Sequence, residues 1–190
     1  MTDLPSTIPQ FIKPQEVVGN NLVFRDANVG DAAFILELRT DADKAKYISE
    51  TSADIQKQVA WLEKYVSDPS QIYFIIQDKD RTPVGTVRLY DQQGDSFCWG
   101  SWIMKAGAPS SYSIESALMI YHYARALGFT KSHFDVRKEN TSVWKFHERF
   151  GARRISETDI DYFFAIDADA IAASLDRYAK FLPNGIRIVP

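Results

Sequence analysis

The sequence predicts a single α/β domain with a mixed, mostly antiparallel seven-stranded sheet flanked by helices. Its composition is that of a folded chain, with 45% apolar and 25% charged residues among 190. Three β-like runs follow one another with only turns between them, which favours antiparallel pairing. In the second half β-like and helical patterns alternate, which favours at least one parallel crossover. We expect the domain over residues 21–190, after an irregular N-terminal arm at residues 1–20.

The first elements after the arm are one strand and two helices. Residues 22–27 form a β-like run, whereas prolines interrupt the arm and leave it without periodicity. Asp31 is a candidate N-cap for a first helix. Ser52 is a candidate cap for a second helix, in which apolar residues recur with helical spacing: Ile55, Val59, Leu62 and Val66.

Three consecutive strands are expected next. Residues 72–76 are a continuous apolar run typical of a buried strand. Residues 78–83 have turn composition and residues 84–90 return as a β-like run, so the two runs predict a hairpin. A second turn at residues 92–95 leads into a further strand at residues 97–104.

The second half of the chain alternates between the helical period and β-like runs. Gly128 follows the longest helical pattern at the position where glycine commonly ends a helix. Pro183 stops the last helical pattern in the same way. The expected elements are a helix at residues 114–127, a strand at 132–137, a helix at 141–150, strands at 152–156 and 162–166, and a helix carrying Ile171, Leu175, Tyr178 and Leu182.

Charge and cysteine content exclude several classes of protein. Lys and Arg number 22 and Asp and Glu 25, a net charge of −3, so no positive excess indicates a nucleic-acid partner. The single cysteine, Cys98, forms no internal disulfide, and no cluster of residues has metal-ligand spacing, so we expect a cytoplasmic protein without a metal. The N-terminus has no basic head before an apolar core, and no segment approaches the ~20 apolar residues of a membrane helix, so neither a signal peptide nor a membrane anchor is predicted.

A loop of small residues at 105–113 leads into the longest helix. Such a loop presents free backbone N–H groups that, together with the helix dipole, suit a phosphate group. The alternative is an ordinary connection between a strand and a helix, with a serine as the cap. Four residues of the loop also carry hydroxyl groups, namely Ser110, Ser111, Tyr112 and Ser113.

Residues 99–152 contain four parts in a specific order: a strand, the small-residue loop with its helix, a strand ending at Asn140, and a helix. The last helix ends in His147-Glu148-Arg149-Phe150-Gly151-Ala152, with Asn140 seven residues before His147. The runs at 83–87 and 99–103 fit the same pattern. In this order and spelling, residues 21–166 resemble the GNAT superfamily of acetyl-CoA-dependent N-acetyltransferases.

The resemblance implies an enzyme that moves the acetyl group of acetyl-CoA directly to a primary amine. His147 stands where the family often has a tyrosine that protonates the departing thiolate, a task that imidazole can perform. Asn140 would border the pantetheine arm, and an asparagine at this place can also cap the following helix. Ser110 and Tyr112 stand where the family commonly has glycines. The cofactor-binding residues implied are Trp102, Ile103 and Met104 for the pantetheine arm, Ser110, Ser111, Tyr112 and Ser113 for the pyrophosphate, and Asn140.

Two segments, residues 136–152 and 161–182, further resemble the branch that acetylates amino groups on nucleotide-linked deoxysugars for surface polysaccharide or glycan biosynthesis. The expected partner is therefore a small-molecule amine, and the aromatic content suits a homodimer interface. An acceptor of this kind would require cations for its diphosphate and an aromatic ring for its base. The residues available for these tasks are Arg25, Arg39, Arg88, Tyr47, Trp61, Tyr90 and Trp102.

Two alternatives remain open at the level of sequence. A protein N-terminal acetyltransferase of the ribosomal-protein type would share the fold and the acetyl-CoA but act on a peptide. A non-catalytic acyl-CoA-binding sensor or interaction module would bind the ligand without turnover. The general base also remains open, because the sequence does not show which of Glu37, Glu50 and Asp91 faces the cleft.

Overall fold

The computed structural model describes residues 8–190, which fold around one nine-stranded sheet with the order β7-β8-β6-β5-β4-β3-β2-β1-β9. The expectation of seven strands is therefore wrong by two. The pairing of β5 with β6 is parallel and every other pairing in the sheet is antiparallel, which confirms a mixed, mostly antiparallel sheet. The strands are β1 (Glu16–Val18), β2 (Val23–Asp26), β3 (Ile72–Gln77), β4 (Pro83–Gln93), β5 (Ser96–Met104), β6 (Lys131–Arg137), β7 (Arg153–Glu157), β8 (Asp161–Ile166) and β9 (Arg187–Val189).

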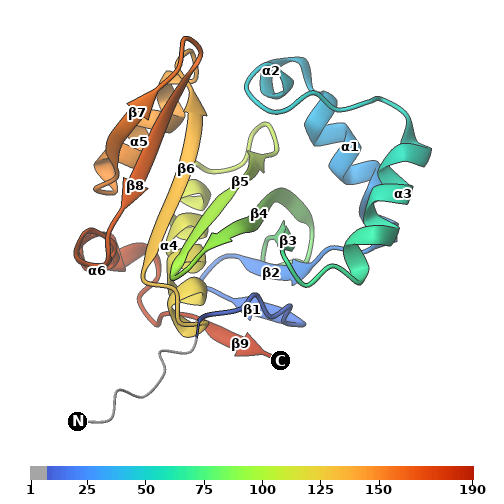
Figure 1. The fold of residues 1–190 in the computed structure, drawn as a ribbon. Helices are drawn as coiled ribbons and strands as arrows, with labels where there is room; N and C mark the ends of the chain where they lie inside the picture. The colour runs from blue at the N-terminus through green and yellow to red at the C-terminus, as the bar shows by residue number, and fades with distance from the viewer. Residues whose placement is uncertain (1–7) are drawn as a thin grey trace.

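The two additional strands lie at one edge of the sheet, near the chain termini (Figure 1). Val17 of β1 pairs with Phe24 of β2 on one side and with Ile188 of β9 on the other, and its side chain is fully buried. The arm expected to be irregular thus contributes a strand at Glu16–Val18, and residues 1–7 of that arm lie outside the described residues. Strands of three residues are too short to show a period of two in the sequence.

Helices cover both faces of the sheet, as the alternation along β3 shows. Tyr73 and Ile75 pack into a cluster with α1 and α3, whereas Phe74 and Ile76 belong to the main core beneath α4. Successive side chains of a strand point to opposite faces, so the continuous apolar run of β3 serves two separate layers. The helices are α1 (Ala32–Thr40), α2 (Ala42–Ala45), α3 (Ile55–Val66), α4 (Ser110–Ala126), α5 (Thr141–Arg149) and α6 (Ala168–Arg177), with short 3₁₀ turns at Val29–Asp31 and Ala179–Phe181.

Three helix ends differ from the expected positions. Asp54 caps α3 by accepting a hydrogen bond from the Gln56 N–H at 2.9 Å, two residues after the expected Ser52. Helix α4 begins at Ser110, four residues before the expected start at residue 114, so the serines expected in the loop lie in its first turn. Helix α6 ends at Arg177 and continues only as a 3₁₀ turn before Pro183. Within residues 8–190, no helix combines the length and the apolar character that crossing a membrane requires.

Strands β5 and β6 separate soon after they start, and this separation positions the site. They pair only at Ser96 with Lys131 and at Phe97 with Ser132, and then diverge (Figure 1). On its other side β5 remains paired with β4, with a register shift where Ser101 takes a positive φ of 46°. The two strands remain in close contact past this shift. A Cβ atom added to Gly85 of β4 would lie only 2.6 Å from the Ile103 carbonyl oxygen of β5, so the approach requires glycine. The far half of β5 therefore has one free edge.

Candidate active site

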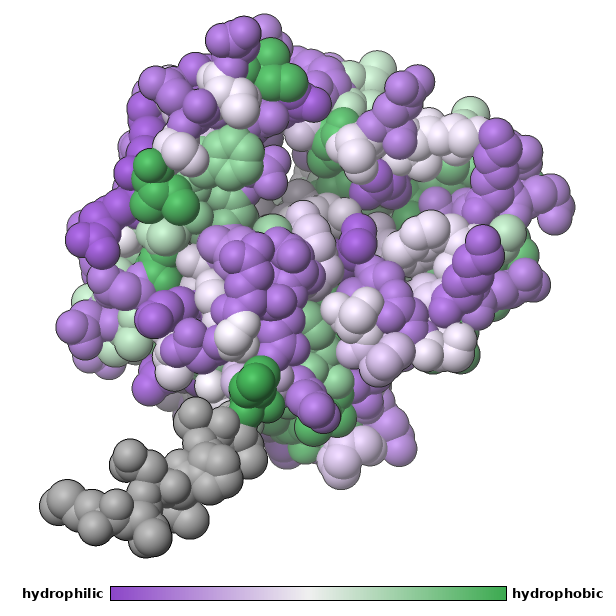
Figure 2. All heavy atoms as spheres, viewed as in Figure 1, coloured by the Kyte–Doolittle hydropathy of each residue, from purple (hydrophilic) through white to green (hydrophobic). Residues whose placement is uncertain are grey.

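A cavity of about 560 Å³ lies beside the free edge of β5, between that strand, the start of α4 and helix α5; we call it the β5–α4 cavity. Figure 2 shows the surface hollowed above the diverging strands. The floor is fixed by Trp102, whose ring lies 5.0 Å from that of Phe146 and whose Nε1 donates to Ser116 Oγ at 3.1 Å. The lining residues are Asp43, Lys44, Tyr47, Ile48, Trp102, Ile103, Met104, Ser110, Ser113, Ile114, Asn140, Ser142, Val143, Phe146 and Arg149.

Six of the eight expected cofactor-binding residues line this cavity: Trp102, Ile103, Met104, Ser110, Ser113 and Asn140. Ser111 and Tyr112 do not line it. Residues three and four apart share a face of a helix, so Ser110, Ser113 and Ile114 point into the cavity together. The two residues between them point elsewhere for the same reason.

Backbone groups supply the polar part of the cavity. Beyond Phe97, the side of β5 that faces β6 pairs with no strand in the described part of the chain, so its N–H and C=O groups are available to a ligand. At the start of α4 the N-cap is Pro109, which offers no capping side chain. The Tyr112 N–H donates to the Pro109 carbonyl oxygen at 3.0 Å, whereas the N–H groups before it lack intrahelical partners and carry the positive end of the dipole of this 17-residue helix.

Asn140 lies between β6 and α5 and contributes to the cavity with its side chain. Its backbone carbonyl accepts hydrogen bonds from the N–H groups of Val143 and Trp144, both at 3.2 Å. Its side chain makes no capping hydrogen bond to the helix. The capping alternative is therefore not met by the side chain of Asn140, which remains available to a ligand.

His147 lies in the core instead of the cavity. It is 5% exposed, its ring lies 4.1 Å from that of Phe134 and 5.0 Å from that of Trp99, and Nδ1 has no hydrogen-bond partner. Burial among apolar side chains disfavours the charged imidazolium and lowers the pKa of His147 to about 3. An enclosed, neutral imidazole does not fit the thiolate-protonating role implied by the resemblance, because it does not line the cavity and lacks the second, acidic proton of an imidazolium near neutral pH.

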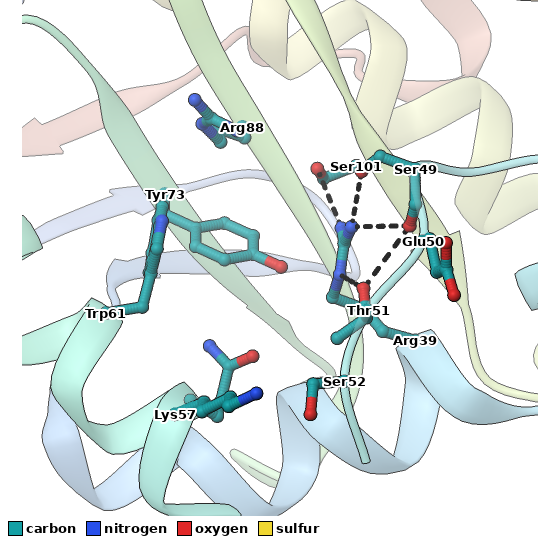
Figure 3. Close-up of a pocket in the computed structure, with 11 residues that line it drawn as sticks. Arg39, Ser49, Glu50, Thr51, Ser52, Lys57, Trp61, Tyr73, Arg88 and Ser101 are labelled. Atoms are coloured by element: carbon teal, nitrogen blue, oxygen red, sulfur yellow. Dashed lines mark hydrogen bonds between the residues drawn. The ribbon is translucent and has the colours of Figure 1, made fainter. Parts of the chain in front are cut away.

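A second cavity of about 290 Å³ lies on the other face of β5, under α1 and α3; we call it the arginine pocket (Figure 3). Ser101 lines this pocket and Trp102 lines the β5–α4 cavity, so the two cavities meet β5 from opposite sides at its register shift. The lining residues are Arg39, Ser49, Glu50, Thr51, Ser52, Lys57, Gln58, Trp61, Tyr73, Arg88 and Ser101.

The fold sorts the cations and aromatic residues that the sequence left unranked. Arg39, Arg88 and Trp61 come together in the arginine pocket, although they lie far apart in the chain. Arg25 is held elsewhere by a two-pronged contact with Asp31, with one N–O distance of 2.6 Å. Tyr47 joins Trp102 in the β5–α4 cavity.

Several cavity residues carried no sequence signal of function. Val143 and Phe146 fall in the helix expected at residues 141–150 and received no role there, yet they line the β5–α4 cavity. The α2 residues Asp43 and Lys44 line it as well, and so does Arg149 of the family motif, to which no task had been assigned. Helix α2 has four residues, which are too few for a periodic pattern in the sequence. Its position beside the β5–α4 cavity therefore became visible only in the folded chain.

Comparisons with known proteins agree with this architecture. The family model described as an acetyltransferase (GNAT) domain matches residues 21–153. A solved structure titled apo FdhC, a nucleotide-linked sugar GNAT, is 36% identical, with a TM-score of 0.79 over 88% of this chain and 98% of that one. No curated protein sequence gives a significant match.

More distant structures share the fold alone. A GCN5-related N-acetyltransferase from Brucella melitensis is 16% identical, with a TM-score of 0.78 over 95% of this chain and 91% of that one. The spermidine N-acetyltransferase from Vibrio cholerae, solved with CoA and spermine, is 17% identical, with a TM-score of 0.71 over 80% of this chain and 98% of that one. Because the family model spans more than half of the chain and a 36% identical GNAT structure aligns with most of it, the chain belongs to the GNAT family of acetyltransferases.

Proposed function

We propose that this acetyltransferase moves the acetyl group of acetyl-CoA directly to a primary amine on a nucleotide-linked deoxysugar. The observation that carries the donor half is the free edge of β5 beside the uncapped start of α4. An extended pantetheine arm pairs with the N–H and C=O groups of such an edge, and a pyrophosphate binds the N–H groups of such a helix start.

The residues of the β5–α4 cavity orient the acetyl donor and keep water away from it. Bound acetyl-CoA supplies the acetyl group as a thioester. The amine nitrogen forms a bond to the acetyl carbonyl carbon, and the C–S bond to CoA breaks. The amine loses a proton, and the released thiolate gains one. The backbone of Ile103 and Met104 fixes the direction of the arm along β5. The rings of Trp102 and Phe146 exclude water from one wall, which strengthens the polar contacts made there.

The acceptor half rests on similarity and charge. FdhC, 36% identical, is described as a nucleotide-linked sugar GNAT, and this chain aligns with 98% of it. The spermidine enzymes, by contrast, share only the fold at 17% identity. Three cations line the pocket on the other side of β5 from the donor cavity, namely Arg39, Lys57 and Arg88. A polycation such as spermidine is repelled from this pocket, whereas an anionic acceptor is attracted.

An acceptor panel tests the proposal. The purified protein is given acetyl-CoA with a nucleotide-linked amino sugar, spermidine, or a peptide with a free N-terminus, and free thiol and acetylated product are both measured. We expect kcat/KM for the nucleotide-linked amino sugar to exceed the others by at least ~100-fold. Preference for the peptide or for spermidine would identify a different acceptor class. Binding of acetyl-CoA without transfer to any acceptor would identify a sensor instead of an enzyme.

A further inference from the structure

The arginine pocket holds three cations that form no ion pair. In the described part of the chain, Arg39, Lys57 and Arg88 have no carboxylate oxygen within 4.0 Å. Glu50 is the single acid among the lining residues, and its carboxylate points away from the Arg39 guanidinium (Figure 3). Like charges gathered in a partly buried pocket are costly unless an anion joins them.

Arg39 is held in place by neutral acceptors. Its Nε donates to Thr51 Oγ1 at 2.7 Å, and its Nη1 donates to Ser101 Oγ at 3.1 Å. Its Nη2 donates to Ser49 Oγ at 2.8 Å and to the Ser49 carbonyl oxygen at 3.2 Å. Figure 3 shows these contacts around the guanidinium. They fix its position and leave its charge uncompensated, which is the arrangement of a preorganised anion site.

Arg88 approaches the same space from β4. Its Nε donates to Gln71 Oε1 at 2.6 Å, its guanidinium lies 4.3 Å from the centre of the Tyr90 ring, and its Nη groups donate to no described residue. Burial lowers the pKa of Arg88, and the charge of Arg39 lowers it further. A bound anion would offset the repulsion that Arg88 experiences from Arg39.

A buried hydroxyl completes the lining. Tyr73 is 2% exposed, and its OH lines the pocket without a hydrogen-bond partner. A buried polar group in this condition costs free energy in the empty protein. The Thr86 and Arg39 side chains lie near this hydroxyl, and a ligand oxygen in the pocket would give it an acceptor with good geometry.

We propose that the arginine pocket binds the diphosphate of the acceptor, with Arg39, Arg88 and Lys57 as its counter-charges and the Tyr73 hydroxyl as a donor. This inference rests on the proposed function, whose acceptor it anchors. The volume of about 290 Å³ suits a diphosphate group. A diphosphate beside Ser101 would lie one residue along β5 from Trp102, which lines the β5–α4 cavity, and would bring the attached amino sugar close to the proposed path of the acetyl donor.

Calorimetric titration tests the proposal. Because CoA also carries a pyrophosphate, its site is first saturated with desulpho-CoA, and uridine diphosphate, thymidine diphosphate and inorganic pyrophosphate are then titrated. We expect at least one of these anions to bind the saturated protein and spermidine not to bind. If desulpho-CoA itself fails to bind, the proposed function falls. If desulpho-CoA binds and none of the three anions does, only the present inference falls. If spermidine binds the saturated protein, this inference falls together with the anionic acceptor of the proposed function.

Three variants and a matched control locate the bound anion. Arg88→Gln removes a counter-charge. Tyr73→Phe removes a buried hydroxyl that makes no hydrogen bond of good geometry, so the Tyr73→Phe protein should be about as stable as the parent. We expect each to weaken anion binding by about 10-fold or more, and Lys57→Gln by several-fold. Lys64→Gln, on the exposed face of α3 outside the pocket, should leave binding unchanged. Unchanged binding in both Arg88→Gln and Tyr73→Phe would place the anion elsewhere and overturn the proposal.

Discussion

His147 links the stability of the fold to pH, because its imidazole must stay neutral in the folded state. In the unfolded chain it takes up a proton below its ordinary pKa of 6.5, whereas burial lowers the folded pKa to about 3. Between these two values the unfolded state holds more protons than the folded state. The contribution of His147 to the free energy of unfolding is therefore fully present above pH 6.5, and it is lost as the pH falls from 6.5 toward 3.

Replacing His147 with phenylalanine should remove this pH dependence. Phe keeps an aromatic ring among Phe134 and Trp99 and eliminates the unpaired Nδ1. In urea unfolding at pH 7.5, 6 and 5, the parent should lose up to ~1.4 kcal/mol of unfolding free energy per pH unit below 6.5 relative to the variant. Parallel pH curves for the two proteins would show that His147 has the same pKa in the folded and unfolded states and takes up a proton without unfolding. The same variant should keep its acetyl-transfer activity, since His147 does not line the cavity.

Glu115 of α4 is a buried carboxylate that holds the chain entering β2. It is 1% exposed, and Oε1 accepts hydrogen bonds from the N–H groups of Asn20, Asn21 and Leu22 at 2.8, 2.6 and 3.0 Å. We expect Glu115→Ala to lower the free energy of unfolding by about 3–5 kcal/mol, because it leaves these N–H groups without an acceptor.

Glu115→Gln keeps one acceptor oxygen and should cost less than Glu115→Ala. Glu63→Ala, an exposed position on α3, should change the free energy of unfolding by less than ~0.5 kcal/mol. Chemical denaturation of the three variants provides the comparison. Equal losses for the alanine and glutamine variants of Glu115 would mean that the negative charge, and not the acceptor oxygen, stabilises this loop.

At the scale of the element, the start of α4 combines two effects of charge that can be separated. A negative side chain near a helix N-terminus stabilises the helix by about 0.3–1 kcal/mol, whereas it repels a phosphate bound there. Ser110→Asp places this charge inside the β5–α4 cavity. We expect unchanged or slightly higher stability and a loss of acetyl-CoA affinity of about 10-fold or more, measured by calorimetry.

The adjacent Ser111→Asp is the matched control. It adds the same charge to the same helix turn, but Ser111 does not line the cavity. Its effect on acetyl-CoA affinity should be several-fold smaller than that of Ser110→Asp. Equal losses of acetyl-CoA affinity in both variants would show that the charge acts only through the electrostatic field of the helix start. Unchanged affinity in both would show that the pyrophosphate does not bind at this end of α4.

At the scale of the whole molecule, there are two separate cavities on opposite sides of β5. We therefore expect the stabilisation by one ligand in each cavity to be additive in the free energy of unfolding. A ligand at 100 times its Kd adds about 2.7 kcal/mol to the free energy of unfolding. In a domain of this size that corresponds to a rise in Tm of roughly 5–10 °C. We expect desulpho-CoA and a nucleoside diphosphate each to raise Tm, and the two together to give the sum of the separate shifts. A combined shift equal to the larger single shift would mean that both compete for one cavity.

Elements with strong local patterns could be predicted from the amino-acid sequence. The apolar run of β3, the spacing of Ile55, Val59 and Leu62 in α3 and the order of strand, loop and helix around Asn140 all lie where they were predicted. Hydrophobic periodicity is a local property, so a few turns of helix or one strand suffice to show it. The family pattern likewise identified the acetyltransferase fold and six of the fifteen residues that line the β5–α4 cavity.

Tertiary structure alone decided which side chains meet. Val17 becomes a central residue of the core because β2 and β9 flank its short strand, and no local pattern announces such pairing. His147 follows a family motif but faces the apolar core, since the exact rotation of α5 determines which residues reach the cavity. Arg39 and Arg88, 49 positions apart in the chain, share a pocket only because α1 folds back over β4 and β5. Contacts between distant segments depend on packing of the whole chain, which is why the sequence indicated the chemistry of this protein and the fold decided where that chemistry is placed.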